Sequence, residues 1–440
     1  MKIAIIGGGG SGMVTAYLLD QTGHDVSVFE RQPTLGGHIR TLNKNVQPNR
    51  SDCAEVLENG VLEFPSAFHN FLDLMRQLEV ELEQVDVGSG LFLSKVGPES
   101  GDFSGHILSG AMIRKNFTGL HRWLEYWRLD KLYARSAGFW MRMQLKKEQD
   151  FYDQPLSQQL PSRDLRNTWL KLLTMYSYSI PFDLIDDFPA ELAIPALRQY
   201  IFAKWFRIKG GVYTYIEKIL ARFSGNIYLN ADIKGITRSE YGVTIELSDA
   251  TQLETTQQFD KVVFATPPDQ VLKLLADPTQ NERKRFSHWQ ANHIQSILHS
   301  DTTMYQPYDI QTHGEFDFFH TENGWGYNAA LNQLCGLPSG AAAKQHYSLA
   351  FNLDSLIDPE KILHIQEHHT PLYTTESFYY RDETIATNGE NNTYYAGAYL
   401  ADGLHEGAVV SAMRVAKLVG TVKSRKRILL PQFVEEVTFV

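Results

Sequence analysis

Short apolar runs and helical apolar patterns alternate in the first thirty residues of the chain. Residues 3–6 are a run of Ile and Ala that is typical of a buried strand, and residues 13–19 carry apolar side chains at helical spacing. A second short apolar run follows at 26–29. This order predicts a strand, a helix and a second strand parallel to the first.

The next part of the chain has longer helical patterns. Residues 65–90 carry apolar side chains at helical spacing, and residues 110–205 read as mostly helical and rich in tryptophan. Prolines divide this second stretch into separate helices, and they stand at positions 155, 161, 181, 189 and 195.

Strand patterns dominate the remainder. After a helix expected at 213–222, short apolar runs predict strands, which cover 227–229, 233–237, 243–247 and 261–265. Residues 290–380 read as strands with loops, and residues 394–420 as a strand, a turn and a helix. Both ends and the middle of the chain are therefore expected to form one sheet-based α/β domain that two insertions interrupt.

A glycine motif joins the first predicted strand to the first helix. In the order Gly7-x-Gly9-x-x-Gly12, the first glycine permits a tight turn, the second lets the backbone approach a pyrophosphate, and the third lets helix and strand pack closely. Gly10 and Ser11 then begin the helix, whose N-terminal N–H groups and dipole favour phosphate.

An acidic residue completes this unit. Glu30 ends the second strand, eighteen residues after Gly12, where a carboxylate can accept both hydroxyls of an adenosine ribose. The same carboxylate would repel the 2′-phosphate of NADP. The first forty residues therefore predict a binding site for a dinucleotide without that phosphate.

Composition narrows the setting. The chain has 440 residues, 43% of them hydrophobic and 21% charged, and a net charge of −10, which argues against a nucleic-acid partner. The two cysteines form neither a CxxC motif nor a disulfide framework, which suits a reducing cytoplasm. We expect a cytoplasmic protein, since no apolar run is long enough to span a membrane and the first apolar stretch breaks into glycines, unlike a signal peptide.

Three further motifs resemble one flavoprotein family. Glu30-Arg31, followed at the family's spacing by Gly36-Gly37-His38-Ile39-Arg40-Thr41, resembles the acidic residue and the GG-x-x-x-[ST] motif of the FAD-dependent amine oxidases and phytoene desaturases. The segment 230–233 is similar to the family's adenine-contacting segment, and the segment 395–408 resembles its last flavin motif. Within this superfamily, the GGH sequence, Leu298-His299-Ser300-Asp301 and the C-terminal pattern look closest to a bacterial subgroup described as predicted NAD/FAD-binding proteins.

The resemblance implies a Rossmann-type, GR2-like FAD-binding domain with an inserted α+β substrate domain. We expect the FAD-binding domain to comprise residues 1–62, 205–275 and 385–425. The substrate domain would comprise 63–204, mainly helical, and 276–384, mainly β, and a tail would follow at 426–440.

The same resemblance implies non-covalent FAD. The residues expected to contact it are Gly7, Gly9, Gly10, Ser11, Gly12, Glu30, Arg31, Gly36, Gly37, His38, Arg40, Thr41, Ile233, Gly397, His405, Glu406 and Ala408. One position departs from the family pattern. Amine oxidases place arginine after the paired glycines, where this chain has His38. This difference weakens an assignment to monoamine oxidase itself.

Four residues are candidates for catalysis. His405 could contact the flavin ring or act as acid or base, or it could cap the helix that it begins. Tyr399 could form a wall of an aromatic substrate cage, or it could be a core tyrosine. Tyr327 and Asn328 lie on a strand expected to face the cavity. Glu406 could also simply complement a helix dipole.

Two other chemistries are not supported. His368 and His369 are adjacent on a predicted strand and therefore point to opposite faces, so we expect no metal site there. The chain has no GxSxG-like motif for a serine nucleophile.

A basic and aromatic stretch stands apart from the flavin motifs. Residues 114–147 contain nine Lys or Arg and two acidic residues, a local charge of +7, with Trp123, Trp127, Phe139 and Trp140 between them. This composition suits contact with an anionic membrane surface or an acidic carrier protein. A solvated helix whose aromatic face packs in the core would have the same composition. The tail residues Lys423, Arg425, Lys426 and Arg427 could add to this contact.

The sequence thus predicts an FAD-dependent oxidoreductase, either an oxidase or a desaturase. It would remove hydride from a hydrophobic small molecule, such as an alkyl or acyl chain or an alkyl amine, and pass electrons to oxygen or a quinone. One alternative is a double-bond isomerase that uses FAD without net redox change. The other is a non-enzymatic flavin-binding interaction protein.

Overall fold

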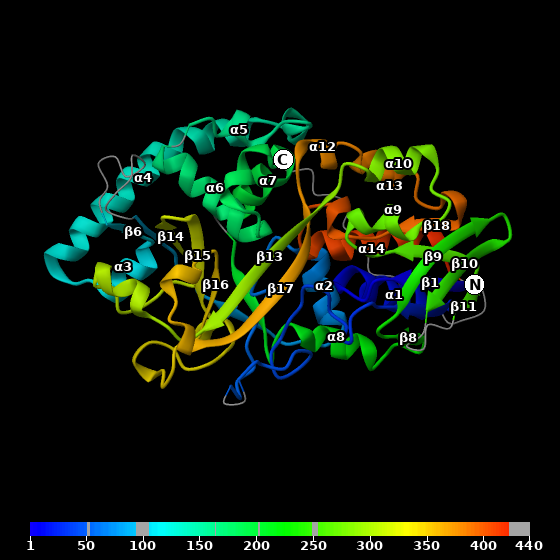
Figure 1. Cartoon of the computed structure of the whole chain (residues 1–440). Helices are drawn as coiled ribbons and strands as arrows, with labels where there is room; N and C mark the ends of the chain where they lie inside the picture. Colours follow the sequence, from blue (N-terminus) through cyan, green and yellow to red (C-terminus); the bar gives the residue numbers. More distant parts are fainter. Residues whose placement is uncertain (51–52, 94–104, 163, 201–202, 249–253, 422–440) are drawn as a thin grey trace.

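A parallel sheet forms one end of the protein, on the right in Figure 1. The computed structural model describes residues 1–50, 53–93, 105–162, 164–200, 203–248 and 254–421. In sheet order the five strands are β18 (Thr393–Tyr395), β12 (Lys261–Phe264), β1 (Lys2–Ile6), β2 (Asp25–Phe29) and β8 (Asn226–Tyr228). All neighbours pair in parallel, as the short apolar runs predict.

Alternate residues of β1 face two different layers. Ile3 and Ile5 pack in a core with four helices, α1 (Gly10–Gln21), α2 (His69–Gln77), α8 (Tyr213–Leu220) and α14 (His405–Val419). Ala4 and Ile6 face a second core that includes an antiparallel sheet, β9 (Asp232–Ser239), β10 (Gly242–Ser248) and β11 (Glu254–Phe259). The fold class is therefore α/β, with a parallel sheet between a helical layer and a β layer.

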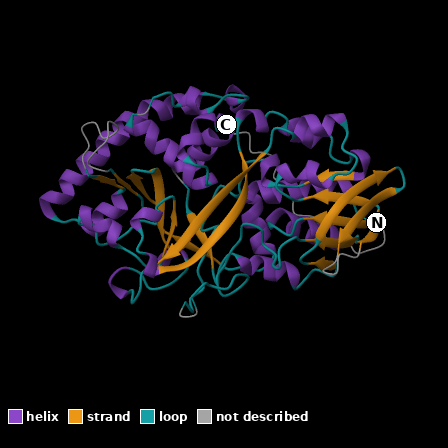
Figure 2. Ribbon diagram, viewed as in Figure 1, coloured by secondary structure: helices purple, strands orange, loops and turns teal. Residues whose placement is uncertain are grey.

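A second sheet occupies the middle of the molecule. Its seven strands, in order, are β17 (Ile362–Leu372), β13 (Gln290–His299), β16 (Ser348–Phe351), β15 (Gly324–Ala330), β14 (Asp317–Thr321), β5 (Gly90–Phe92) and β6 (His106–Leu108). The long antiparallel pair β13 and β17 runs diagonally between the two halves (Figure 2).

Helices cover this sheet at the left and top of Figure 1. They are α3 (Gly110–Asn116), α4 (Gly119–Leu145), α5 (Leu156–Gln159), α6 (Leu165–Tyr178) and α7 (Ala190–Tyr200). Four of the five expected prolines lie between helices, but Pro195 lies inside α7. Short helices complete the described chain: α9 (Val271–Leu274), α10 (Gln280–Phe286), α11 (Leu331–Leu334), α12 (Thr375–Phe378) and α13 (Arg381–Ala386).

The helical prediction for 65–90 is wrong over most of its length. Only α2 (His69–Gln77) is helical, and Glu79, in the left-handed region with φ 56°, follows its end. The chain then forms β4 (Leu82–Val85), which pairs with β7 (Trp205–Ile208). Strand β11 was not predicted, because its polar sequence ETTQQF lacks an apolar alternation.

The expected domain boundaries stay a prediction, and one of them crosses a sheet. Strand β7 lies in the segment expected to belong to the FAD-binding domain, yet it pairs with β3 (Phe64–Pro65) and β4 from the expected substrate domain. The strands β5 and β6, from the segment expected to be mainly helical, join the seven-stranded sheet. The tail 426–440 and its basic residues from Lys423 lie outside the described residues.

A buried ion pair ties three segments of the parallel-sheet end together. Arg238 of β9 donates to both carboxylate oxygens of Glu282 in α10 and also pairs with Asp277. Glu282 also accepts the hydroxyl of Tyr395 at 2.9 Å. Burial alone would raise the pKa of Glu282, but the hydrogen bonds from Arg238 and Thr279 lower it to about 2.

Replacing this carboxylate should destabilise the fold. Because Glu282→Gln removes the buried carboxylate and leaves only the partly exposed Asp277 to compensate the charge of Arg238, we expect the free energy of unfolding to fall by about 3 kcal/mol in urea denaturation at pH 7. The pKa of Glu282 is lower in the folded than in the unfolded state, so its contribution should disappear as the pH falls from about 4.5 towards 2. The control Asp73→Asn, which removes a surface pair with Arg76, should change little. Equal losses in both variants would contradict the prediction.

Candidate functional site

The glycine turn after β1 is enclosed by backbone. A Cβ at Gly12 would overlap the carbonyl oxygen of Gly7, and a Cβ at Gly7 would lie 2.6 Å from the carbonyl oxygen of Ala265. These contacts are possible only without side chains, and they bring the start of α1 against the ends of β1 and β12. Ser11 is partly accessible in the first turn of α1, and the N-cap residue Gly9 has no side chain to satisfy its N–H groups.

The second glycine pair lies directly against the first motif. The N–H of Gly36 donates to the carbonyl oxygen of Gly8 at 2.9 Å. Gly37 has φ +59°, and a Cβ there would lie 2.9 Å from the Cα of Gly9. Two motifs that are separated in sequence therefore form one backbone-lined wall.

Glu30 is held at the edge of this wall. One carboxylate oxygen accepts the N–H of Gly8 at 2.7 Å and the other accepts the N–H of Gln32 at 2.8 Å. Each oxygen keeps a second lone pair for a further donor. The backbone of Glu30 also pairs with Tyr228 and Ala231, so the acid and the segment 230–233 lie side by side. Ile233 follows as a half-buried residue of β9, and Arg31 is exposed.

His38 and Arg40 follow the paired glycines in the chain. His38 keeps accessible surface although protein surrounds it, and its Nε2 donates to the carbonyl oxygen of His369 at 2.7 Å. Burial lowers the pKa of His38 and also that of Arg40, which lies near the charge of Glu30. Thr41, in contrast, is fully buried and donates to Glu58 at 2.9 Å.

His405 is the first residue of α14, and its side chain lies beside the start of α1. Its Nε2 is 3.4 Å from the hydroxyl of Tyr215 and 3.9 Å from the place that a Cβ on Gly10 would occupy. The rings of Phe64 and Phe71 contact its imidazole edge-on. Burial lowers the pKa of His405 to about 4, so the ring is neutral at pH 7.

The rest of the last motif supports this corner. Gly397 follows β18, and its N–H donates to the hydroxyl of Ser411 in α14 at 2.9 Å, while Ala408 is buried one turn into the same helix. Glu406 has a role that the sequence did not predict. Its carboxylate accepts the N–H groups of Asn70 and Phe71 at 2.9 and 2.8 Å. Glu406 therefore caps the N-terminus of α2.

Three buried polar atoms near the glycine segments lack hydrogen-bond partners. Nη1 of Arg40, Nδ2 of Asn59 and Oγ1 of Thr266 are buried and have no hydrogen-bond partner in the described part of the chain. Buried donors without partners are costly, and a bound polar group can satisfy them. A cationic donor next to a glycine wall, an uncapped helix N-terminus and a carboxylate at the far edge fit the pyrophosphate and ribose of a dinucleotide.

A buried polar chain joins the glycine segments to the long ribbon of β13 and β17. Oγ of Ser296 donates to Oδ1 of Asn59 at 2.6 Å and lies 2.9 Å from Nε2 of His368. The serine has one proton, so Nε2 of His368 must donate to it. Gly60 completes the contact, since a Cβ there would lie 3.3 Å from the imidazole of His368.

Glu63 follows Asn59 and Gly60 in the sequence. Protein atoms enclose most of its side chain, although part of it stays accessible. Burial raises its pKa to about 7, although the hydroxyl of Tyr176 donates to one oxygen at 2.8 Å. Its other oxygen has no partner among the described residues. The ring of Tyr176 packs edge-on against Tyr327, with centroids 5.0 Å apart. The predicted residue Tyr327 is thus next to a carboxyl group.

Asn328 points away from this cluster, since it follows Tyr327 on the same strand. Its Oδ1 lies 2.9 Å from Nε2 of His299, and its Nδ2 donates to the hydroxyl of Tyr305 at 3.0 Å. Tyr305 in turn donates to Asp317 at 2.8 Å. Both groups of the Asn328 amide are therefore used inside the sheet, and the structure does not bring Asn328 and His405 together.

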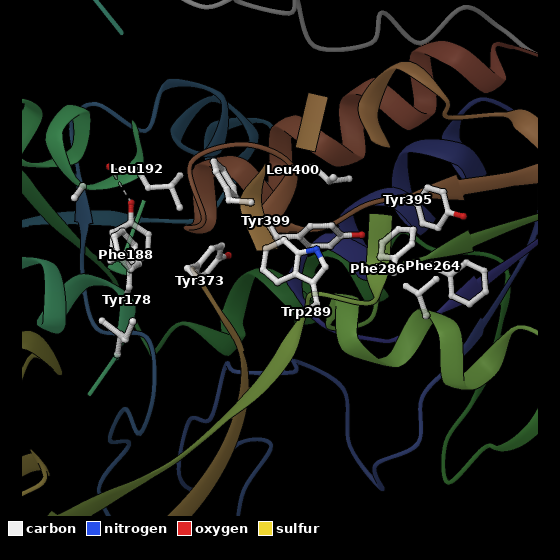
Figure 3. Packing of buried hydrophobic residues seen from close by; sticks show 14 of the residues in the cluster. Tyr178, Phe188, Leu192, Phe264, Phe286, Trp289, Tyr373, Tyr395, Tyr399 and Leu400 are labelled. Carbon is white, nitrogen blue, oxygen red and sulfur yellow. Dashed lines mark hydrogen bonds between the residues drawn. The ribbon is translucent and has the colours of Figure 1, made fainter. Parts of the chain in front are cut away.

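Tyr399 lies in an aromatic core cluster (Figure 3). Its ring is 5.5 Å from Trp289 and covers Gly397, where a Cβ would overlap it. Only 3% of the residue is exposed, and its hydroxyl has no partner in the described chain. This placement agrees better with a core tyrosine beside the last motif than with an open wall of a substrate cage.

Other surfaces and groups are less informative about the site. An open groove of about 600 Å³ lies between α6, the 3-10 turn at 182–187, and β13 and β15, and Lys171, His293 and Trp325 line it. No sequence-predicted site residue borders it within the described chain. In the same residues, no cluster of three or more His, Cys, Asp or Glu could hold a metal ion. None of the helices described combines the length and hydrophobicity that a bilayer crossing requires.

Five residues that contact the site were not predicted from the sequence, and they are Glu58, Asn59, Glu63, Ser296 and Tyr215. Glu58 and Asn59 precede Gly60 in a polar Glu-Asn-Gly triplet that interrupts an apolar stretch, a signal that could have been noticed. Ser296 and Tyr215 carry no such signal, because only the packing of distant segments brings them to the site.

Comparisons with known proteins agree with this geometry. The chain is 25% identical over 324 residues to an uncharacterized protein of Acanthamoeba polyphaga mimivirus, an alignment that covers 65% of this chain and 61% of that relative. Among solved structures, it resembles a putrescine oxidase with bound putrescine, at 14% identity, 95% and 99% coverage of the two chains and a TM-score of 0.63.

Two further structures share the fold. They are a fatty acid isomerase from P. acnes (17% identity, 95% and 97% coverage, TM-score 0.63) and cyclohexylamine oxidase from Brevibacterium oxydans (11% identity, 95% and 99% coverage, TM-score 0.64). At these identities the likeness establishes the fold alone.

The family is established by a sequence match. The sequence model of the flavin-containing amine oxidoreductase family matches residues 11–305, which is more than half of the chain. The chain therefore belongs to the flavin-containing amine oxidoreductase family.

Proposed function

We propose that the protein is an FAD-dependent oxidoreductase that removes hydride from a hydrophobic small molecule, such as an alkyl or acyl chain or an alkyl amine. The observation that carries the proposal is the contact of the Gly9 and Gly37 backbones beside the unpartnered guanidinium nitrogen of Arg40. Family membership supports a flavin at this position. Oxygen or a quinone would accept the electrons.

Each end of the dinucleotide has a group to hold it. Glu30 and the segment 230–233 would contact the adenosine, and Arg40 with the first turn of α1 would bind the pyrophosphate. His405 is neutral and lies beside Gly10, which favours contact with the cofactor over acid or base catalysis. Non-covalent binding is proposed because neither cysteine belongs to these segments; Cys53 is buried, and Cys335 is half-buried with a thiol pKa that its enclosure raises.

When bound, the flavin would supply the hydride acceptor, and the chain would orient the substrate and move its proton. Glu63 is suited to the proton, because its pKa of about 7 allows it to be ionised near neutral pH, and one oxygen is free of described partners. The rings of Tyr176 and Tyr327 beside it would contact an apolar substrate.

The glycine contact can be tested with a matched pair. Gly37 (φ +59°) and Gly340 (φ +60°) share a left-handed backbone, but a Cβ on Gly340 meets nothing within 4 Å. We expect Gly37→Ala to weaken FAD binding at least tenfold, whereas Gly340→Ala should bind FAD like the wild type, measured by the flavin absorbance retained on dialysis.

A second variant guards against misfolding of the first. Arg40→Met removes a buried charge without adding volume, so FAD affinity should fall about tenfold or more while the unfolding midpoint does not fall. Undiminished FAD binding by both Gly37→Ala and Arg40→Met would overturn the cofactor site.

Glu63 can be tested by the pH dependence of flavin reduction. An essential base must be ionised, so the anaerobic reduction rate should rise with pH through about 7 in the wild type. Glu63→Gln should be about 10²–10⁴-fold slower and lose this dependence. Glu58→Gln is the matched control, because burial raises the pKa of Glu58 to about 7 as well, but both its oxygens are hydrogen-bonded to Thr41 and Val212. An unchanged pH profile in Glu63→Gln would remove Glu63 from the mechanism.

The same assays separate the proposed oxidation from its alternatives. Amines, fatty acids and polyenes would be screened for bleaching of the flavin absorbance near about 450 nm. Peroxide formed together with an oxidised product supports an oxidase, and a product of unchanged mass would identify an isomerase. If none of these compounds reduces the flavin and none is isomerised, the result would favour a flavin-binding protein without this activity.

A further inference from the structure

Helix α4 exposes large apolar side chains that no other described element covers. It has 27 residues, and Leu120, Trp123, Trp127 and Leu145 are 74%, 75%, 58% and 86% exposed. Leu124 and Met141 are exposed as well. Isolated exposed apolar residues are common, but these six large ones on one helix, in addition to the exposed Tyr133 on another side of it, are not.

These side chains share one side of the helix. At about 100° per residue, positions 120, 123, 124, 127, 141 and 145 fall within one strip, with the small residues Ala134 and Gly138 between them. The buried side chains point to the opposite side, and they are Glu125, Leu129, Leu132, Ser136, Phe139 and Met143. Since that opposite side already packs on the protein, the exposed strip is not needed for the core.

Basic residues flank the exposed strip. Arg128, Arg135 and Arg142 recur every seven residues along one border, and Nζ of Lys131 lies 3.6 Å from the ring centre of Trp127. Residues 114–147 carry a net charge of +7 in a chain of −10. The positive field is therefore concentrated where the apolar side chains are exposed.

The position of α4 suits a broad, flat partner. The helix lies along the outer edge of the molecule, at the end remote from the parallel sheet (Figure 1). The exposed Trp and Leu side chains of the helix point outward, where they can insert into a deformable surface such as a lipid interface. Tryptophan and leucine with adjoining Lys and Arg are the residues that interfacial helices insert among anionic lipid headgroups.

We propose that α4 docks the protein on the surface of an anionic lipid bilayer. Trp123, Trp127 and Leu120 enter the headgroup region, and Arg128, Lys131, Arg135 and Arg142 meet the lipid phosphates. An acidic protein partner and a second copy of this chain are the competing occupants of the strip. The proposal does not depend on the substrate or on catalysis.

Vesicle flotation of the full-length, flavin-containing protein tests the proposal. Vesicles of phosphatidylcholine alone would be compared with vesicles that contain about one third phosphatidylglycerol. We expect binding to the anionic vesicles, weaker binding in about 1 M NaCl, and little binding to the neutral ones. The partition coefficient should fall more than about tenfold in Trp123→Ser/Trp127→Ser and about 25-fold in Arg135→Gln/Arg142→Gln.

Matched controls separate the strip from general hydrophobicity and from misfolding. Tyr241→Ser/Tyr379→Ser removes two aromatic side chains that are exposed elsewhere, and it should bind vesicles like the wild type. Flavin content and the unfolding midpoint should be the same in all variants. A blue shift of tryptophan emission on vesicle binding, reduced in Trp127→Phe, would place that ring in the lipid interface.

Several outcomes would overturn the proposal. They are absence of binding to anionic vesicles, and equal binding by the Trp123→Ser/Trp127→Ser variant and the wild type. A dimer in sedimentation that this variant abolishes would identify the strip as a contact between copies. Strip-dependent retention on immobilised polyglutamate without vesicle binding would identify an acidic protein partner.

Discussion

The contact between the backbones of Gly9 and Gly37 is the constraint on which the rest of the site depends. A Cβ on Gly37 would lie 2.9 Å from the Cα of Gly9, so the two motifs can meet only as bare backbone. Arg40 follows this contact, and its carbonyl oxygen accepts the N–H of Asn59 at 2.7 Å. Asn59 and Gly60 in turn contact Ser296 and His368 of the ribbon of β13 and β17.

Much of the fold could be predicted from the sequence because its signals are local. Buried parallel strands such as Ile3–Ile6 are short apolar runs, and glycines that permit backbone contact stand at fixed spacing. The strand β11 and the short α2 could not be predicted in the same way. A polar edge strand has no apolar alternation, and the spacing over 65–90 does not show where the chain leaves the helix for β4.

The candidate site was less predictable, because its chemistry arises between segments. Glu406 has the position of a cofactor ligand in the motif, yet its carboxylate accepts N–H groups at the N-terminus of α2, more than three hundred residues away in sequence, and caps that helix. Glu63 stands in an apolar stretch, and its burial in the folded chain, aided by the charge of Glu315, raises its pKa to about 7. Asn328 was grouped with Tyr327, but alternation along β15 sends it into a network with His299 and Tyr305.

On the proposed function, the backbone wall of Gly9 and Gly37 binds one FAD without a covalent bond. Acid precipitation of the purified protein, followed by mass analysis of the supernatant, tests it most directly. We expect release of about one FAD per chain. Glu30 and the segment 230–233 can contact one adenosine, and Arg40 with the first turn of α1 can bind one pyrophosphate. Release of FMN or a nicotinamide dinucleotide instead, flavin that stays in the pellet, or protein that takes up no FAD on reconstitution would contradict it.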